Sequence, residues 1–156
     1  MVAIVAGALA PILQVAGLLS PVVTLDAPLF AALGTVAAVV GIAATLWAQE
    51  SMGDSWRIGV DAGETTRLVE GGMFGWVRNP IFTAMLVFGA GVALMAPNPL
   101  ALIGFVLLLT SIELQVRFVE EPYLHRTHSE RYRNYASRVG RFVPRIGRSP
   151  AGGPSA

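Results

Sequence analysis

NPIFTAMLVFGAGVALMAPNPLALIGFVLLLTSI, residues 79–112, contains no charged side chain. An apolar run longer than about 18 residues is typical of a helix that crosses a membrane. This run is long enough for two short helices of that kind, and Pro97-Asn98-Pro99 supplies the break between them. The stretch therefore predicts a hairpin of two apolar helices, over residues 80–96 and 99–120.

Two more uncharged runs precede the hairpin, at Val2–Leu25 and Ala27–Gln49. The whole chain is 54% hydrophobic and only 13% charged, against roughly 25% charged residues in soluble domains. Pro11 is expected to kink the first helix. We therefore predict an all-α integral membrane protein with four transmembrane helices, near residues 2–23, 28–48, 80–96 and 99–120.

Arginine supplies every basic side chain of the chain and lies mostly in two segments. Residues 49–79 contain three arginines, and residues 122–148 contain seven. Because positively charged segments stay on the cytoplasmic side, both segments and both termini are predicted to be cytoplasmic, in the inner (plasma) membrane of a bacterium. Residues 1–148 are expected to form a single membrane domain, followed by a disordered tail over 149–156.

Several function classes are excluded by residues that the sequence lacks. Without cysteine there is no disulfide framework, thiol nucleophile or cysteine metal site. No His/Cys cluster or phosphate-binding glycine loop occurs either, and neither a metal nor a nucleic acid is predicted as a partner. No basic residue precedes Arg57, so the first apolar run lacks the n-region of a cleaved signal peptide and is expected to remain as a helix.

The residues after Pro122 have a helical pattern of their own. Thr127-His128-Ser129-Glu130 fits a capping box, and Gly140 is a plausible stop. Apolar and aromatic residues then recur at helical spacing, and arginines occupy other positions; the recurring residues are Tyr132, Tyr135, Val139 and Phe142. The pattern predicts a short basic amphipathic helix at the membrane surface, whose simplest role is an anchor to anionic lipids.

The hairpin is expected to bring opposite charges together at its cytoplasmic end. Residues 80–96 would span about 25 Å and residues 99–120 about 33 Å as helices, so the start of one and the end of the other lie at similar depth. Asn79-Pro80 is a good helix start, with Asn as N-cap and Pro at the first position. Arg78 and the unpaired N–H groups of that start would face the end of the other helix.

The end of the second helix carries a polar stripe. Glu113, Arg117 and Glu121 are spaced i, i+4, i+8, and Glu120 lies three residues after Arg117. One interpretation is an internal ion-pair network that holds the helix. The other is a site for a zwitterionic amino-acid group, with its ammonium toward the glutamates and its carboxylate toward Arg78 or the helix start, because charges at membrane depth usually face an interior.

At these residues the sequence resembles the small integral-membrane methyltransferases related to isoprenylcysteine carboxyl methyltransferase and to phospholipid methyltransferases. The stretches that carry the resemblance cover about half of the chain and share its order and spacing. They are MGDSWRIGVD (52–61), LVEGGMFGWVRNPIF (68–82) and EEPYLHRTHSERYRNYASRVGRFVP (120–144).

The resemblance implies S-adenosylmethionine as the methyl donor, and that donor contains a zwitterionic amino-acid group. By analogy with the family, Glu120 and Glu121 hold this amino-acid end, and Arg78-Asn79-Pro80 lies beside the cofactor. The remaining expected contacts are glycines that permit close backbone approach and a helix that covers the adenosine; they are Gly71, Gly72, His128, Tyr132 and Tyr135.

The sequence also departs from the family pattern. Many relatives have Arg-His-Pro where this chain has Asn79, Tyr where it has Phe82, and Gly where it has Ser129. A catalytic imidazole at position 79 is therefore excluded. Asn79 as a helix cap and His128 as a surface residue of the capping box are equally good structural interpretations, and Trp76 either lines the site or lies at the membrane interface.

The predicted activity is methyl transfer from S-adenosylmethionine to a lipophilic acceptor, a small molecule or lipid that enters from the bilayer. A carboxylate acceptor needs no base, whereas an amine or thiol is helped by one, and Glu113 or Glu121 could serve. Arg78 or Arg117 would orient an anionic acceptor. We therefore name Arg78, Arg117 and Glu113 as catalytic candidates.

Two other classes of function, a membrane scaffold and a small transporter, also use a bundle of short apolar helices. A non-catalytic membrane scaffold, or a degenerate relative, would share the fold, and a scaffold need not bind the cofactor. A small multidrug transporter would also have four short helices, but it would need an acidic residue in the first one, and Val2–Leu25 has none.

Overall fold

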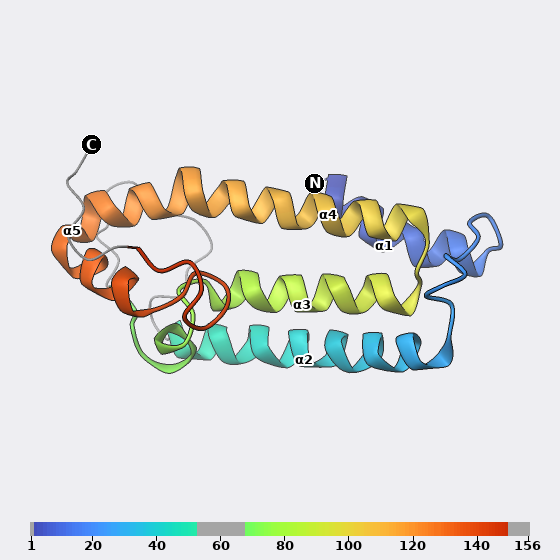
Figure 1. Ribbon diagram of the computed structural model, residues 1–156, viewed down its shortest axis with the longest axis horizontal. Coiled ribbons are helices and arrows are strands. Elements are labelled where there is room, and N and C mark those ends of the chain that lie inside the picture. Colours follow the sequence, from blue (N-terminus) through green and yellow to red (C-terminus); the bar gives the residue numbers. More distant parts are fainter. Residues whose placement is uncertain (1, 53–67, 150–156) are drawn as a thin grey trace. The chain divides into compact units, whose positions relative to one another are not determined.

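The computed structural model describes residues 2–52 and 68–149, which are mainly helical (Figure 1). Among the described residues, β-type pairing is limited to one isolated parallel bridge between Val77 and Gly140. The predicted all-α fold is confirmed. In chain order the elements are α1 (Val2–Val15), α2 (Pro28–Met52), the 3₁₀ turn η2 (Gly72–Gly75), α3 (Pro80–Met95), α4 (Pro99–Gln115), the π-helical turn η3 (Val116–Glu120) and α5 (Glu121–Arg138).

Some sequence-based expectations fall on residues that the structure does not describe. Almost all of the family-like stretch over 52–61 lies outside the described residues, and so do Arg57 and most of the predicted tail over 149–156. Ser149, the first residue of that tail, is described, and its N–H donates to the Ala136 carbonyl at 3.0 Å.

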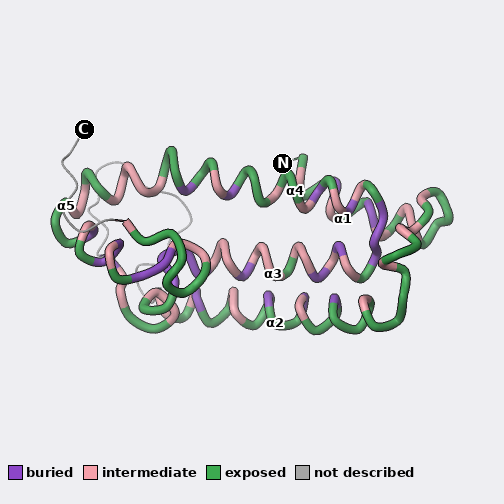
Figure 2. Tube along the Cα trace, in the orientation of Figure 1, coloured by how far each residue is buried: buried purple, intermediate pink, exposed green. Residues whose placement is uncertain are grey.

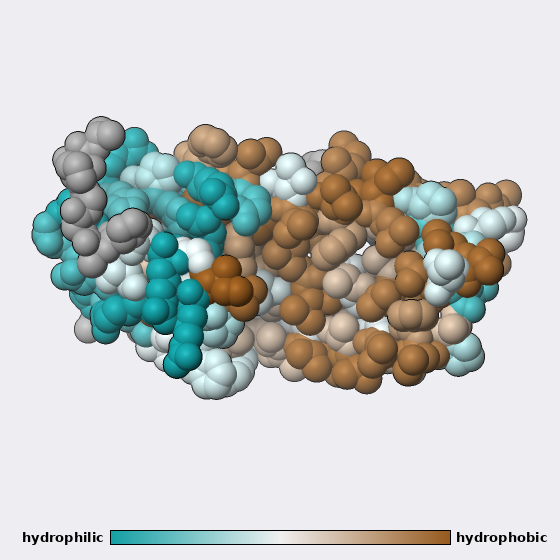
Figure 3. All heavy atoms as spheres, viewed as in Figure 1, coloured by the Kyte–Doolittle hydropathy of each residue, from teal (hydrophilic) through white to brown (hydrophobic). Residues whose placement is uncertain are grey.

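The described residues form two compact units, each considered by itself. The first contains residues up to 43 together with 84–114, and the second contains 44–52, 68–83 and 115–149. On the face that Figure 3 shows, apolar atoms predominate over the helices of the first unit and hydrophilic atoms over the second. The chemistry of polar groups is therefore concentrated in the second unit.

Two helical stretches in the described part of the chain are long and apolar enough to cross a membrane. They are α2 and the helical stretch from Pro99 to Arg138, whereas α1 and α3 are shorter apolar helices. Apolar side chains such as Leu33, Val36 and Val39 are exposed along α2, as the green segments of Figure 2 show. Exposed aliphatic side chains on an apolar helix are what a lipid-facing surface requires.

Glycines bring α2 and α3 into close contact in the first unit. A Cβ added at Gly91 would lie 2.6 Å from the Gly34 carbonyl oxygen and 2.5 Å from the Ala38 nitrogen. A Cβ at Gly41 would lie 2.7 Å from the Phe88 nitrogen. Small residues at an apolar helix interface permit this approach.

The predicted break at Pro97-Asn98-Pro99 is confirmed, and Asn98 explains how it is held. Its side chain is fully buried, and its Oδ1 accepts the Ala101 N–H at 2.9 Å, which caps the start of α4. Its Nδ2 donates to the Ala10 carbonyl at 3.0 Å and to Gln14 Oε1 at 2.9 Å. One buried amide therefore starts α4 and ties it to α1.

The first helix is shorter than predicted, because it ends at Val15 rather than near residue 23. Gly17 has a left-handed backbone with φ of +74°, and the Leu18 N–H donates back to the Leu13 carbonyl at 2.9 Å. This is a Schellman ending, in which glycine satisfies the last free carbonyl groups of a helix. The unbroken hydrophobicity of the run concealed this stop signal.

The predicted end of the second hairpin helix at residue 120 is wrong. Helical backbone continues from α4 through η3 into α5, and Pro122 lies in the first turn of α5, where a missing N–H is tolerated. The spacing of the charged residues forms a stripe only if side chains follow each other at about 100° per residue, as in an α-helix. That geometry holds only up to Gln115, because the π-helical turn that follows has i→i+5 bonding and shifts the register.

The predicted capping box at Thr127 is also wrong in its position. Residue 127 lies inside α5, and the helix is interrupted at Ser129, whose φ of 39° and ψ of −114° are non-helical. The segment is therefore not one straight surface helix but two helical parts joined by a kink. Its end is close to the predicted one, because α5 stops at Arg138, two residues before Gly140.

Candidate functional site

The second part of α5 lies on a small core. The buried residues of this core come from α5 and from the segment before η2; they are Leu68, Tyr132, Tyr135, Ala136 and Val139. Tyr135 donates its hydroxyl proton to the Phe74 carbonyl at 2.6 Å. The apolar face that the sequence assigned to the membrane surface is thus buried within the protein, so α5 does not offer this face to lipid.

The chain after α5 runs alongside the start of α3. The Arg78 N–H donates to the Gly140 carbonyl at 2.8 Å, and the Asn79 N–H donates to the Arg141 carbonyl at 3.1 Å. One turn into α3, Thr83 Oγ1 donates to the Phe142 carbonyl at 2.9 Å. Backbone N–H groups at the start of this helix, expected to bind a ligand, are therefore partly used by the C-terminal segment.

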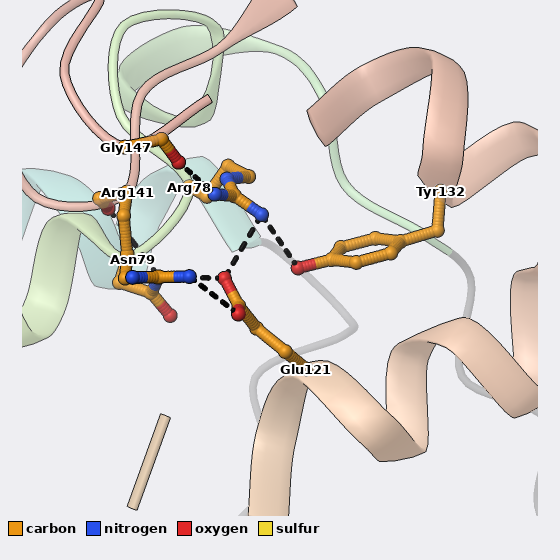
Figure 4. Close-up of polar contacts among 6 residues, drawn as sticks. All are labelled: Arg78, Asn79, Glu121, Tyr132, Arg141 and Gly147. Atoms are coloured by element: carbon orange, nitrogen blue, oxygen red, sulfur yellow. Dashed lines mark hydrogen bonds and ion pairs between the residues drawn. The ribbon is translucent and has the colours of Figure 1, made fainter. Parts of the chain in front are cut away.

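Arg78 is the centre of a buried polar cluster (Figure 4). Its side chain is only 1% exposed, and its Nη1 lies 2.9 Å from Glu121 Oε1 and 3.2 Å from the Tyr132 hydroxyl oxygen. Its Nη2 donates to the Gly147 carbonyl at 2.5 Å. A single guanidinium thereby connects α3, α5 and the C-terminal segment.

Glu121 lies between two arginines in this cluster (Figure 4). Besides Arg78, it receives both N–H groups of the Arg141 fork, Nε and Nη2, at 2.8 Å each. Such bidentate pairs are among the strongest charge-assisted contacts in proteins. Glu121 thus joins the guanidinium groups of Arg78 and Arg141 in one cluster.

Glu120 differs from its neighbour in having no ionic partner among the described residues. It is the last residue of η3 and half-buried, and neither a hydrogen bond nor an ion pair is found for it within 2–52 and 68–149. Adjacent helical positions point in directions about 100° apart. Of the paired glutamates, Glu121 is thus committed to arginines, and Glu120 has its charge available.

Tyr132 is a neutral member of the cluster. Burial raises the pKa of its phenol, an effect that the nearby Arg78 partly opposes. The hydroxyl oxygen accepts a hydrogen bond from Arg78, and the ring packs edge-on against His125, with ring centroids 4.7 Å apart. A protonated phenol can accept from the arginine and still has one proton to donate.

Two buried nitrogens have no hydrogen-bond partner within the described part of the chain. They are Nε of Arg78 and Nε2 of His128. Buried polar atoms of native proteins are nearly always satisfied by a partner, an ordered water or a ligand. Both nitrogens belong to residues that the family resemblance places beside the cofactor.

The other predicted site residues are placed as follows. Gly72 has φ of +57°, and a Cβ there would lie 2.7 Å from Ser51 Oγ, so it packs closely on the end of α2. Asn79 is buried, and its Nδ2 donates to the Arg141 carbonyl at 3.3 Å. Glu113 is half-buried near the end of α4, and Arg117 is exposed in η3; both make further interactions.

Sequence reasoning missed Arg141 and Gly147. Arg141 looked like one of several surface arginines of an amphipathic helix, and Gly147 was assigned no role. Gly147 has φ of +73°, so its being glycine was a signal for a turn. Nothing in the sequence indicated that its carbonyl reaches Arg78.

Residues 29–131 match the protein family described as phospholipid methyltransferase. The chain belongs to the phospholipid methyltransferase family. Members of this family are S-adenosylmethionine-dependent methyltransferases, so the resemblance inferred from the sequence is confirmed. Arg78 and Glu121 lie within the matched residues, as do nearly all of α2 and the whole of α3 and α4.

Two known proteins are similar to this phospholipid methyltransferase family member. The chain is 33% identical over 79 residues to the protein-S-isoprenylcysteine O-methyltransferase of Saccharomyces cerevisiae, a match that covers 51% of this chain and 33% of the yeast protein. It also resembles a solved structure of the eukaryotic intramembrane Ras methyltransferase ICMT (isoprenylcysteine carboxyl methyltransferase). That likeness has a TM-score of 0.66 at 21% identity, over 76% of this chain and 43% of the other, and shows a shared fold.

Proposed function

We propose that this chain transfers a methyl group from S-adenosylmethionine to a lipophilic acceptor held in the membrane, an acceptor with a carboxylate, thiol or amine. Membership of the phospholipid methyltransferase family supports the reaction class. The observation that carries the proposal is the buried cluster of Arg78, Glu121 and Tyr132, which lies directly at the start of the apolar helix α3. A buried, charged and hydrogen-bonded site at the end of a membrane helix provides partners for a polar cofactor next to the apolar surroundings that a lipophilic acceptor needs.

In the proposed arrangement α1, α2, α3 and α4 all cross the bilayer. The exposed apolar side chains of α2 and the length of the stretch from Pro99 support this placement. The arginine-rich segments, residues 49–79 and 122–148, would then lie on the cytoplasmic side, together with both termini. The cofactor would enter from that side and the acceptor from the bilayer.

The described residues fit the amino-acid end of S-adenosylmethionine. Its ammonium needs an acidic partner, and Glu120 is a half-buried carboxylate without one among the described residues. Its carboxylate needs donors, and Arg78 Nε is a buried donor without an acceptor there. His128 Nε2 is a third buried atom that lacks a partner, and we propose that it faces the adenosine together with Tyr132 and Tyr135.

When bound, the cofactor would supply a methyl group already activated on a sulfonium. The chain's own groups then position and shield the reactants, which can lower the barrier by roughly 7–11 kcal/mol when alignment is good. We propose that Arg78 orients an anionic acceptor, helped by Arg117. For an amine or thiol acceptor, Glu113 would take the proton.

Transfer of labelled methyl groups tests the proposed function directly. The purified protein would be incubated with S-adenosylmethionine carrying a radiolabelled methyl group and with a total extract of bacterial membrane lipids. We expect label in the organic phase and identification of the methylated product by mass spectrometry. Cofactor binding by calorimetry without any label transfer would instead indicate a degenerate relative, and no binding at all would indicate a non-catalytic scaffold.

Glu120→Gln is expected to weaken cofactor binding by about 10- to 100-fold without destabilising the protein. It removes a carboxylate that has no ion pair within the described residues, so folding loses little. A charge-assisted contact contributes about 1.5–3 kcal/mol, and 1.4 kcal/mol is a factor of ten in affinity. Isothermal titration calorimetry with the cofactor, and thermal unfolding in detergent, measure the two effects.

The matched control for Glu120 is Glu130→Gln. Glu130 is an exposed carboxylate on α5 that pairs with Arg133, and its loss should leave cofactor affinity unchanged. If Glu120→Gln bound the cofactor as tightly as Glu130→Gln does, Glu120 would not hold the ammonium group.

A further inference from the structure

The C-terminal segment carries apolar side chains that the protein does not bury. In residues 142–148, Val143 is 49% exposed and Ile146 is 65% exposed. The small core beneath the site is made instead by α5 and Leu68. In the orientation shared by Figures 1 and 3, an apolar group of atoms interrupts the hydrophilic surface where the red C-terminal loop lies.

This loop is fixed beside the first turn of α3. The Phe142 carbonyl accepts from Thr83 Oγ1, and the Arg141 carbonyl accepts the Asn79 N–H. α3 is apolar from Pro80 onward, so its first turn marks the depth at which polar surroundings give way to apolar ones. Val143 and Ile146 are therefore held at the level where a bilayer would begin.

The charge of the loop is of one sign. No acidic residue follows Glu130 in the chain. Arg145 and Arg148 are exposed and have neither an ion pair nor a hydrogen bond among the described residues. The loop therefore combines the exposed apolar side chains of Val143 and Ile146 with two arginines. A leaflet rich in anionic phospholipid offers the complementary surface, with apolar acyl chains below negatively charged headgroups.

We propose that residues 142–148 form a lipid-contacting loop that inserts Val143 and Ile146 into the acyl boundary and places Arg145 and Arg148 on anionic phospholipid headgroups. Arginine is suited to this role because its planar fork matches phosphate oxygens. The proposal rests on the membrane location of the chain given under the proposed function, and not on methyl transfer.

The same loop also completes the Arg78 cluster. Arg141, just before it, forms the bidentate pair with Glu121, and the Gly147 carbonyl within it accepts from Arg78. Contact with lipid would thus hold in place the segment that closes the site. Arg145 and Arg148 are positioning residues in this arrangement, because they touch headgroups and not the reacting atoms.

The absence of cysteine from the sequence makes a direct test possible in the whole chain of 156 residues. Single-cysteine variants carrying a nitroxide spin label would be placed in nanodiscs of phosphatidylcholine with or without phosphatidylglycerol. Access of oxygen, which partitions into lipid, is compared with access of a water-soluble nickel chelate. The label sites are Ile146→Cys, with Val36→Cys on the exposed face of α2 as the lipid reference and Asn134→Cys on exposed α5 as the water reference.

The label at position 146 is expected to favour oxygen over the nickel chelate, as at position 36, and to move deeper when phosphatidylglycerol is present. The double substitution of Arg145→Gln and Arg148→Gln should abolish that dependence on anionic lipid, with a change of several-fold in the oxygen-to-nickel accessibility ratio. An equal depth with and without phosphatidylglycerol would overturn the assignment of the arginines to anionic headgroups.

Two other outcomes would overturn the lipid contact itself. The loop would be a solvated one if the label at 146 matched that at 134 in both lipid mixtures. Protection from both reagents, with dipolar broadening between labels, would assign the loop to contact between two copies of the chain. Methyl transfer is measured separately on the same nanodiscs, so an inserted loop without activity would count against the proposed function alone.

Discussion

Replacement of Glu121 by glutamine is expected to lower the free energy of unfolding by about 3–5 kcal/mol, because it leaves two partly or wholly buried guanidinium groups without their shared anion. Arg78 is 1% exposed at its side chain and Arg141 is 16% exposed. Glutamine has nearly the same shape, so the substitution tests charge and not volume. Removing one partner of a buried ionic group is costly because the remaining charge cannot regain its water.

The unfolding temperature in detergent, followed by tryptophan fluorescence, measures this effect, and a decrease on the order of 10 °C is expected. The chain offers a closely matched control in Glu70→Gln. Glu70 also connects two arginines, Arg131 and Arg138, but these are 56% and 69% exposed. Exposed pairs contribute about 0–1 kcal/mol each, so this variant should unfold within a few degrees of the unsubstituted protein.

The two adjacent glutamates are therefore expected to have different roles, Glu121 in stability and Glu120 in cofactor binding. Glu121→Gln is expected to reduce stability first and cofactor binding as a consequence, whereas Glu120→Gln should reduce binding alone. Equal unfolding temperatures for Glu121→Gln and Glu70→Gln would contradict the role of Glu121 as the anion of the Arg78 cluster. Glu121 would then return as a candidate for the cofactor's ammonium group.

Gly140→Ala is expected to detach the C-terminal segment from the start of α3 and to cost on the order of 3 kcal/mol, the upper end of typical overpacking. An added Cβ would lie 2.7 Å from the Ile146 carbonyl oxygen and 2.8 Å from the Arg145 nitrogen. Both are backbone atoms, so no side-chain rotation relieves the clash. The turn that returns Gly147 to Arg78 would have to open.

Hydrogen exchange with mass spectrometry reads this change at specific amides. The N–H groups of Arg78 and Asn79 are bonded to the carbonyls of Gly140 and Arg141, and we expect them to exchange faster in the variant while the amides of α2 keep their protection. Gly71→Ala is the control, because a Cβ there meets nothing within 4 Å. Unchanged protection at residues 78 and 79 in Gly140→Ala would show that the segment tolerates the methyl group by a local shift.

The helical framework was readable from the sequence to the extent that single residues carry a local signal. Uncharged runs predicted apolar helices, and Pro97-Asn98-Pro99 predicted the break between α3 and α4 in the correct place. The end of α1 was missed although Gly17 marks it. A continuous apolar run indicates that a helix can form there, but it does not indicate the residue at which the helix ends. The π-helical turn before α5 has no sequence signature of its own, so the register of the charged stripe could not be projected through it.

The site was only partly readable for a related reason. Composition and spacing, together with the family resemblance, selected Arg78, Glu120, Glu121 and Tyr132 as residues of interest. They did not indicate that Arg141 would take Glu121 as its partner, because the two lie in different parts of the C-terminal region and their pairing depends on the turn back toward α3. The sequence left Glu121 as either a member of an ion-pair network on its own helix or a contact of the cofactor, and the fold instead pairs it with Arg78 and Arg141.

By itself, the sequence determined that this chain is helical, apolar over most of its length, basic in two segments and related to membrane methyltransferases. These properties follow from local composition and helix signals, which do not depend on distant contacts. Only the tertiary structure decided which of Glu120 and Glu121 has its charge available, and that α5 buries its apolar face while the loop after it exposes Val143 and Ile146. Those outcomes depend on which groups meet when segments far apart in the sequence pack together. A charge stays unpaired, and an apolar side chain stays exposed, only where the fold brings no other segment against it.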